Sequence, residues 1–193
     1  MGAKRRRKII VYIATSADGY IARPDGGVEW LDRPRPKGNY GMGTFFSSID
    51  AIVWGRKTYD LALRMHGGAA GFGPKVRNYV FSRRRSPQSP ADGVDFVREP
   101  IRSFARRLRA QPGKDVWMMG GGGIIASFLD EGAIDEFIVH VVPVFIGEGI
   151  PLIAPRHRNV PLKLRSVRRY PDGVIRIHYD LARRAARSAR AKR

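Results

Sequence analysis

The chain of 193 residues contains no cysteine. Disulfides, thiolate zinc sites and cysteine nucleophiles are therefore excluded. No uncharged apolar run approaches about 18 residues, so a membrane-spanning helix is excluded as well. An apolar run at 9–14 follows a basic segment, but it is too short for a signal peptide and Asp18 and Gly19 follow it closely. We therefore expect a cytoplasmic protein with no membrane partner.

Acidic residues are scarce relative to basic ones. The chain has 17 Asp and Glu but 36 Lys and Arg, which gives a net charge of +19. Residues 1–8 hold five of the basic residues and residues 182–193 hold six, with no acid in either segment. The segment 9–181 keeps a net charge of only +8. We therefore expect one domain at 9–181 between a basic N-terminal tail, 1–8, and a basic C-terminal tail, 182–193. Such tails are either solvated and disordered or contact nucleic acid or another polyanion.

Short β-branched runs alternate with amphipathic segments along the chain. The run from Ile9 to Ala14 carries no charge, which is typical of a strand buried on both faces. Pro100 begins an amphipathic helix that ends before Pro112. The turn at 171–173 predicts a hairpin. The other expected strands are 51–54, 78–82, 94–97, 116–119, 134–145, 162–169 and 174–181, and the other expected helices are 44–48, 58–64 and 124–129.

Early alternation of strands and helices, followed by a closing hairpin, predicts an α/β fold. The sheet is expected to be mixed but mostly parallel, with an antiparallel hairpin at the C-terminus. The sequence shows neither an internal repeat nor an interdomain linker.

Four consecutive glycines, 120–123, stand between a buried strand and a helical stripe that begins at Ile124. A helix N-terminus presents free N–H groups, and glycines let a phosphate approach them closely. The segment is neither a Walker A loop nor a Rossmann fingerprint. It is therefore either a diphosphate cradle or simply a tight strand-to-helix turn.

Two further strand ends offer partners for anions. Gly55, Arg56, Lys57 and Thr58 follow the second strand, where open α/β sheets bind ligands. Ser82 and Arg83 follow the third. Either segment alone could be a solvated basic turn. Three such sites at strand ends of one sheet are better explained by one long phosphorylated ligand than by three unrelated basic turns.

The first strand stops at small residues and turns at Asp18 and Gly19. Small side chains such as Ala14 would let a flat ring lie against the backbone. A long polar stretch from Thr15 to about Tyr40 follows, and loops of this length are usually functional or disordered.

Taken in order, these segments resemble the dihydrofolate reductase-like superfamily, and in particular stand-alone proteins similar to the C-terminal domain of the riboflavin-biosynthesis protein RibD. The segments that carry the resemblance are 15–22, Trp30, 52–59, 80–83, 120–123 and 142–152. The resemblance covers residues 8 to about 181. It implies a three-layer α-β-α fold and an NADPH-dependent reductase.

The resemblance also implies a role for each matching position. The NADPH diphosphate would lie on Gly120, Gly121, Gly122, Gly123 and Ile124. Adenosine-side phosphates would lie near Gly55, Arg56, Lys57 and Thr58, and the 2′-phosphate near Ser82 and Arg83. The nicotinamide would be lined by Ala14, Ile21 and Ala22, with Trp30 beside the substrate. The protein's part would be positioning and electrostatics, because the cofactor supplies the chemistry.

The substrate side departs from the family patterns. Dihydrofolate reductases carry an acid in the first helix, but residues 40–46 contain none, and the threonine that partners this acid aligns with Val139. The riboflavin reductase has a substrate-binding glutamate where Met119 stands. The catalytic residue is therefore unknown, with Asp18 and Trp30 as candidates. Asp18 could deliver a proton, as could Glu29, Asp32 or a water molecule. His140 lies in an apolar strand and is interpreted as a core or interface histidine. No spacing suggests a metal site.

The expected activity is hydride transfer from NADPH to a small heterocyclic or sugar-derived imine or carbonyl compound. It resembles 5-amino-6-(5-phosphoribosylamino)uracil reductase of riboflavin biosynthesis. Dihydrofolate reductase activity is one alternative. A non-catalytic binder of nucleic acid or another polyanion, acting through the basic tails, is the other. The apolar stretch at 138–146 is longer than one strand of a small monomer needs to bury, and together with the resemblance it predicts a homodimer.

Overall fold

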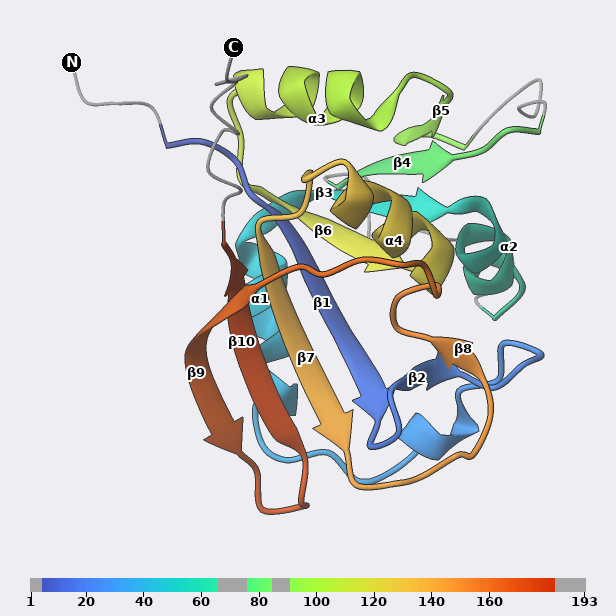
Figure 1. Ribbon diagram of the computed structural model, residues 1–193, viewed down its shortest axis with the longest axis vertical. Coiled ribbons are helices and arrows are strands. Elements are labelled where there is room, and N and C mark those ends of the chain that lie inside the picture. The colour runs from blue at the N-terminus through green and yellow to red at the C-terminus, as the bar shows by residue number, and fades with distance from the viewer. Residues whose placement is uncertain (1–4, 66–75, 85–90, 183–193) are drawn as a thin grey trace, which may run out of the picture.

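The computed structural model describes residues 5–65, 76–84 and 91–182, and a single mixed sheet organises them (Figure 1). The order of its strands is β5-β4-β3-β6-β1-β7-β10-β9. Every pairing from β5 to β7 is parallel, whereas β10 is antiparallel to both β7 and β9. The strands are β1 (Ile9–Ser16), β3 (Ile49–Gly55), β4 (Arg77–Phe81), β5 (Val94–Val97), β6 (Asp115–Gly120), β7 (Glu136–Val142), β9 (Leu162–Arg169) and β10 (Ile175–Leu181). The expected sheet and closing hairpin are confirmed.

Helices cover both faces of the sheet, which gives the expected three layers. The helices α3 (Ile101–Ala110) and α4 (Gly122–Asp130) pack against one face. The helices α1 (Met42–Ser47) and α2 (Arg56–Met65) pack against the other. Successive side chains of β1 point to opposite faces. Accordingly, Ile9 and Val11 join the first core and Ile10 and Tyr12 the second.

Element boundaries differ from the sequence-based ones by a few residues. The strand expected at 134–145 ends at Val142, because Pro143 has no N–H to donate to a ladder. Two very short strands, β2 (Tyr20–Ala22) and β8 (Ile150–Pro151), were not expected. They pair beside the end of β1 (Figure 1). Two 3-10 turns, η1 (Glu29–Leu31) and η2 (Asn39–Gly41), lie in the long polar stretch.

Arg5 and Arg6 are exposed, as expected of a solvated tail, but the expectation is wrong for Arg7 and Lys8. Arg7 is buried, donates to the carbonyl oxygen of Lys114 over 2.6 Å and pairs with Asp50. Lys8 pairs with Glu136. These cations meet carboxylates at the amino ends of the strands, so this part of the segment is folded. Residues 183–193 of the second expected tail lie outside the described residues.

No helix among the described residues is long and apolar enough to cross a membrane.

Candidate active site

The carboxyl ends of β1, β3, β4 and β6 meet at one edge of the sheet, because these strands are parallel. The glycine segment lies at this edge and is held in place by Thr58. The N–H of Gly121 donates to Thr58 Oγ1 over 2.7 Å. A Cβ at Gly55 would lie 3.2 Å from Ile124, so the turns that follow β3 and β6 are in close contact. Two of the sites suggested by the sequence are therefore one site.

The N-terminus of α4 leaves two backbone donors free. Among the described residues, the N–H groups of Gly122 and Gly123 have no acceptor. A Cβ at Gly122 would collide with the carbonyl oxygen of Pro151, whereas a Cβ at Gly123 would meet nothing within 4 Å. Free N–H groups at the positive end of a helix dipole suit a phosphate, and the open space beside Gly123 leaves room for one. Gly122 is required for packing, and Gly123 keeps the approach open.

Ile21 and Ala22 come to this edge on β2. The Cδ1 atom of Ile21 lies 3.6 Å from the position of a Cβ at Gly121. The backbone of Gly149 passes so close to Ala22 that a Cβ there would collide with the Ala22 carbonyl oxygen. Ala14, at the end of β1, packs against a separate small cluster that includes Trp30. The structure therefore brings the expected nicotinamide residues to one edge of the sheet.

Arg56 is more constrained than its sequence suggested. Its Nε donates to both carboxylate oxygens of Asp60, over 2.7 and 2.9 Å, and its guanidinium lies 5.3 Å from the Phe96 ring centre. Its Nη1 is buried without a partner. The spacing of four residues between Arg56 and Asp60 is a helical ion-pair signal that could have been read from the sequence. Lys57 beside it is exposed.

Ser82 and Arg83 follow β4, the neighbour of β3. Ser82 is buried, and its hydroxyl accepts the N–H of Arg84 over 3.1 Å. Arg83 is exposed. Ser82 therefore shapes the turn, while Arg83 is able to reach an anion. Residues 85–90, which follow, lie outside the described residues.

Asp18 anchors a loop. Its carboxylate accepts the backbone N–H groups of Ile146, over 3.1 Å, and Gly147, over 2.8 Å. Hydrogen bonds from Ser16 and from these backbone groups hold the pKa of Asp18 below its ordinary value. The carboxylate is therefore ionised at neutral pH and holds no proton to donate. This observation counts against the catalytic role considered for Asp18.

Trp30, the other catalytic candidate, packs against a small cluster of Val142, Tyr170 and Val174, as Tyr40 does. Its indole Nε1 is buried and has no hydrogen-bond acceptor. The hydroxyl of Tyr170 donates to the carbonyl oxygen of Tyr40 over 2.9 Å. The hydroxyl of Tyr40 hydrogen-bonds to Asp172.

Two polar residues at this edge were missed as functional candidates. His140 on β7 pairs with Ala14 on one side and with Arg176 of β10 on the other. Its ring centre lies 4.8 Å from that of Tyr12 and 5.9 Å from that of Tyr40. Burial lowers the pKa of His140 to about 4, so the imidazole is neutral at pH 7. The interpretation of His140 as a buried histidine is confirmed, yet neither its Nε2 nor Nε of Arg176 has a hydrogen-bond partner in the described part of the chain.

Glu136, His178 and Asp180 form a group whose ligand atoms lie close enough together for a metal ion. Lys8 and Arg165 already pair with Glu136, and Arg165 also pairs with Asp180. The two positive side chains beside the group would repel a metal cation. We therefore assign these carboxylates to ion pairs with Lys8 and Arg165.

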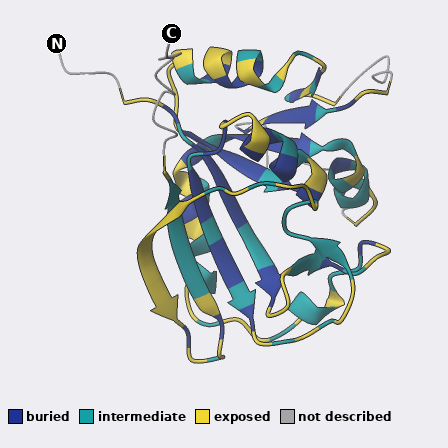
Figure 2. Ribbon diagram, in the orientation of Figure 1, coloured by how far each residue is buried: buried dark blue, intermediate teal, exposed yellow. Residues whose placement is uncertain are grey.

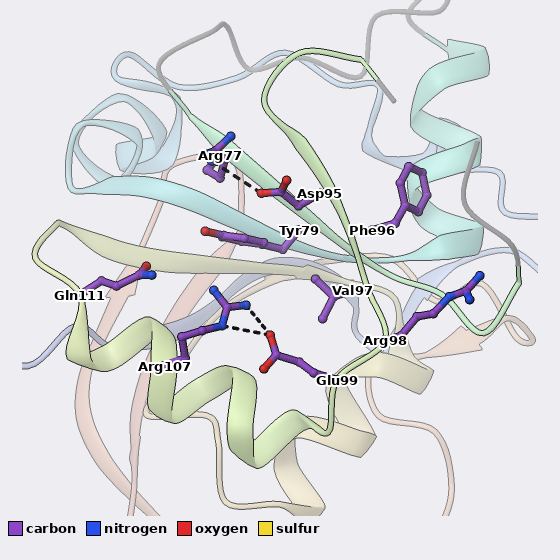
Figure 3. Close-up of a pocket in the computed structure, with 9 residues that line it drawn as sticks. All are labelled: Arg77, Tyr79, Asp95, Phe96, Val97, Arg98, Glu99, Arg107 and Gln111. Atoms are coloured by element: carbon purple, nitrogen blue, oxygen red, sulfur yellow. Dashed lines mark hydrogen bonds and ion pairs between the residues drawn. The ribbon is translucent and has the colours of Figure 1, made fainter. Parts of the chain in front are cut away.

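A cavity of about 590 Å³ lies between β4, β5 and α3, away from the glycine segment (Figure 3). Four of its five ionic side chains pair with one another, since Arg107 meets Glu99 and Arg77 lies 3.6 Å from Asp95. The fifth, Arg98, donates to the carbonyl oxygen of Arg84. None of the residues expected to bind the cofactor lines it. Its lining residues are Arg77, Tyr79, Asp95, Phe96, Val97, Arg98, Glu99, Arg107 and Gln111.

Comparisons with known proteins agree with this architecture. The uncharacterized protein YwjB of Bacillus subtilis (strain 168) is 36% identical over 174 residues, covering 90% of this chain and 97% of YwjB. The structure of the diaminohydroxyphosphoribosylaminopyrimidine deaminase/5-amino-6-(5-phosphoribosylamino)uracil reductase from Thermotoga maritima matches with a TM-score of 0.68 at 15% identity. That match covers 92% of this chain and 57% of the other.

Dihydrofolate reductase from Enterococcus faecalis, solved with NADP(H), matches with a TM-score of 0.63 at 13% identity, over 90% of this chain and 96% of that one. At such identities the two structures show the fold alone, which is dihydrofolate reductase-like. The family model for the RibD C-terminal domain matches residues 7–176. The chain therefore belongs to the RibD C-terminal domain family.

Proposed function

We propose that this protein is an NADPH-dependent reductase whose active site lies at the carboxyl edge of the sheet. The observation that carries the proposal is the glycine segment. Thr58 fixes its backbone, and among the described residues the N–H groups of Gly122 and Gly123 at the start of α4 have no acceptor, with open space at Gly123. Family membership and the likeness to an NADP(H)-bound reductase support the choice of cofactor.

The residues present fit such a cofactor. Gly122 and Gly123 would bind the diphosphate, and the free Nη1 of Arg56 together with Lys57 would bind adenosine-side phosphate. Arg83 would bind the 2′-phosphate beside the turn that Ser82 shapes. Ala14, Ile21 and Ala22 would line the nicotinamide, which supplies the hydride when the cofactor is bound.

The substrate side of the site would orient the acceptor and exclude water. Reduction of a C=N or C=O bond places the hydride on carbon and a proton on nitrogen or oxygen. Asp18, with its lowered pKa, is a poor source of that proton, so we assign its delivery to a water molecule. The acceptor is a small heterocyclic or sugar-derived imine or carbonyl compound. Dihydrofolate is a weaker candidate, because residues 40–46 supply no acid.

The cofactor assignment is tested by thermal unfolding with NADPH. At about 100 times its Kd, a ligand should raise the melting temperature of a chain of this size by roughly 5–10 °C. NADH should bind more weakly, and Arg83→Met should lower the affinity for NADPH by about tenfold and that for NADH little. A melting temperature and a tryptophan fluorescence that ignore saturating NADPH would refute the proposal.

One observation favours a second candidate function, binding of the phosphate backbone of nucleic acid. A cavity of about 550 Å³ has no acid in its lining, which is Arg5, Arg6, Arg106, Arg109, Ala110 and Gln111. Asp115 and Asp135 neutralise Arg5 and Arg6 from nearby. Asp135 also pairs with Arg109 over 2.6 Å, so the exposed Arg106 is the lining arginine without an ion pair among the described residues. This surface could act whether or not the chain is an enzyme.

The test is fluorescence anisotropy of a labelled DNA duplex over a salt series. Binding should weaken steeply with salt, and Arg106→Glu should reduce both the affinity and the salt slope. Arg169→Glu makes the same charge change on β9 and should do much less. Deletion of residues 183–193 tests the C-terminal segment without removing the folded arginines at 5–8. Equal effects of the two substitutions would refute a site at this cavity.

We also propose a homodimer, on grounds that differ from the stretch at 138–146. Most of β7 is buried between β1 and β10 within one chain. Three of the six exposed large apolar side chains of the described residues lie on β9, which is exposed along its whole length (Figure 2). Leu162, Leu164 and Val167 are about half exposed. Light scattering at micromolar concentration should give twice the monomer mass, and Leu164→Glu should give monomers. A monomeric wild type would refute the proposal.

A further inference from the structure

Buried polar atoms without partners gather on one side of the proposed active site. Five buried side-chain nitrogens have no hydrogen-bond partner among the described residues, and three of them belong to Trp30, His140 and Arg176. Buried polar groups are normally hydrogen-bonded, and each exception requires an explanation. A ligand that satisfies all three at once is the simplest one.

The three residues surround one place in the fold. Trp30 and Tyr40 pack against Tyr170 in one cluster, and the His140 ring centre lies 5.9 Å from that of Tyr40 and 6.4 Å from that of Tyr170. Arg176 pairs with His140 in the β7–β10 ladder. Its Nη1 lies 3.6 Å from the position that a Cβ of Gly41 would occupy, which places the guanidinium beside η2.

This place adjoins the expected nicotinamide. Ala14, His140 and Arg176 lie in register across β1, β7 and β10, so their side chains point to the same face of the sheet. Ala14 is the residue expected beside the nicotinamide and packs against the same cluster as Trp30. A molecule held by His140 and Arg176 would therefore lie one strand away from the hydride source.

The donor set restricts the chemistry of that molecule. Trp30 Nε1 and Arg176 Nε can only donate hydrogen bonds, and the neutral imidazole of His140 offers one donor and one acceptor. Arg176 forms no ion pair among the described residues, whereas Arg33 pairs with the carboxylate of Asp172 over 3.8 Å. A planar guanidinium without a carboxylate suits a carboxylate, a phosphate or a pair of carbonyl oxygens.

The segment η2 covers these atoms in the structure. Tyr40 adopts a positive φ of 58° and Asn39 one of 44°, which are unfavourable values for residues with side chains. The carbonyl oxygen of Tyr40 accepts hydrogen bonds from Tyr12, over 3.3 Å, and Tyr170, over 2.9 Å. These bonds hold the segment over His140, so a ligand that reaches His140 must displace Tyr40.

We propose that Trp30, His140 and Arg176 form the substrate-recognition site, and that they select a planar, negatively charged heterocycle with carbonyl oxygens. This inference rests on the proposed reductase function. It places recognition on β7 and β10, whereas the resembled riboflavin reductase uses a glutamate at the position of Met119, on β6. An arginine and a neutral histidine in place of an acid require a ligand with more acceptors than donors.

The experiment uses orotate, a pyrimidinedione that carries a carboxylate, and uracil, which lacks it. Both are titrated by calorimetry into the full-length protein saturated with NADP⁺. Orotate should bind at least about tenfold more tightly than uracil, because a charge-assisted hydrogen bond is worth that much. Arg176→Met should remove this preference, whereas Arg169→Met, the same charge change on β9, should leave it in place.

A second variant guards against misfolding. Trp30→Phe keeps an aromatic ring in the cluster and removes only the donor, so it should weaken orotate by about threefold to tenfold without changing the NADPH-induced rise in melting temperature. Equal affinities for orotate and uracil, no binding of either, or an unchanged preference in Arg176→Met would overturn the recognition site. If NADPH still raises the melting temperature in those cases, the proposed reductase stands. If NADPH itself fails to bind, the reductase proposal fails first.

Discussion

The two edges of the sheet treat charge in opposite ways. At the amino edge, Arg5, Arg7 and Lys8 each meet a carboxylate, from Asp115, Asp50 and Glu136 respectively. At the carboxyl edge, Trp30, Arg56, His140 and Arg176 bury four of the five side-chain nitrogens that have no partner among the described residues, and the amino edge holds the fifth, Nε of Arg109. Paired charges hold the N-terminal segment to the domain. Unpaired buried donors lower the stability of the fold, and we explain their presence by ligands that they bind.

The largest predicted effect is a loss of unfolding free energy on removing a charge pair at the amino edge. Replacing the buried Arg7 by Met leaves Asp50 and the Lys114 carbonyl without their partner, and should cost about 3–4 kcal/mol of unfolding free energy. Urea denaturation measures this cost. Arg102→Met removes an ion pair whose arginine is 77% exposed, and should cost less than about 1 kcal/mol. Similar losses in the two variants would contradict the structural role of Arg7.

The next effect concerns acid sensitivity at the carboxyl edge. The pKa of His140 falls from 6.5 to about 4 on folding, chiefly through burial among Tyr12, Tyr40, Tyr170 and Arg176. The unfolded chain therefore binds more protons between these values. The stability that the neutral His140 contributes is therefore fully present above pH 6.5. It is lost as the pH falls towards 4, by at most about 3 kcal/mol of unfolding free energy.

His140→Gln should remove that part of the acid sensitivity, measured as the difference in unfolding free energy between pH 6.5 and pH 4. His157→Gln replaces an exposed histidine and should keep the sensitivity of the wild type. Unchanged sensitivity in His140→Gln would mean that the histidine is not buried in solution.

A smaller effect separates two neighbouring glycines at the carboxyl edge. Gly122→Ala places a Cβ against the carbonyl oxygen of Pro151 and should cost about 1–3 kcal/mol. Gly123→Ala enters open space near a helix start and should leave stability unchanged or raise it by less than about 1 kcal/mol. Thermal unfolding of the two variants measures the difference. Equal stability would contradict the close contact between the glycine segment and β8.

The sequence predicted the sheet well, because its core strands are uncharged β-branched runs such as the one that begins at Ile9. It missed β2 and β8, whose three and two residues are too few for a pattern. It also misjudged Arg7 and Lys8, since a basic run looks solvated until its acids, such as Asp50 and Glu136, are known to lie beside it.

The cofactor side of the site was accessible from local motifs, and the substrate side was not. The glycine segment and Thr58 each stand out in the sequence, and only their hydrogen bond had to come from the structure. His140 looked like a core residue because its proposed role depends on Ala14, Tyr40 and Arg176, which lie beside it only in the folded chain. The β1–β7 register brings Ala14 beside it from far along the chain. No spacing rule connects such residues.

A crystal structure with NADP⁺ tests the central claim most directly. The account predicts the diphosphate on the N–H groups of Gly122 and Gly123, and the nicotinamide beside Ala14, on the same face of the sheet as His140 and Arg176. A diphosphate bound elsewhere, or a nicotinamide turned away from Ala14, would contradict it.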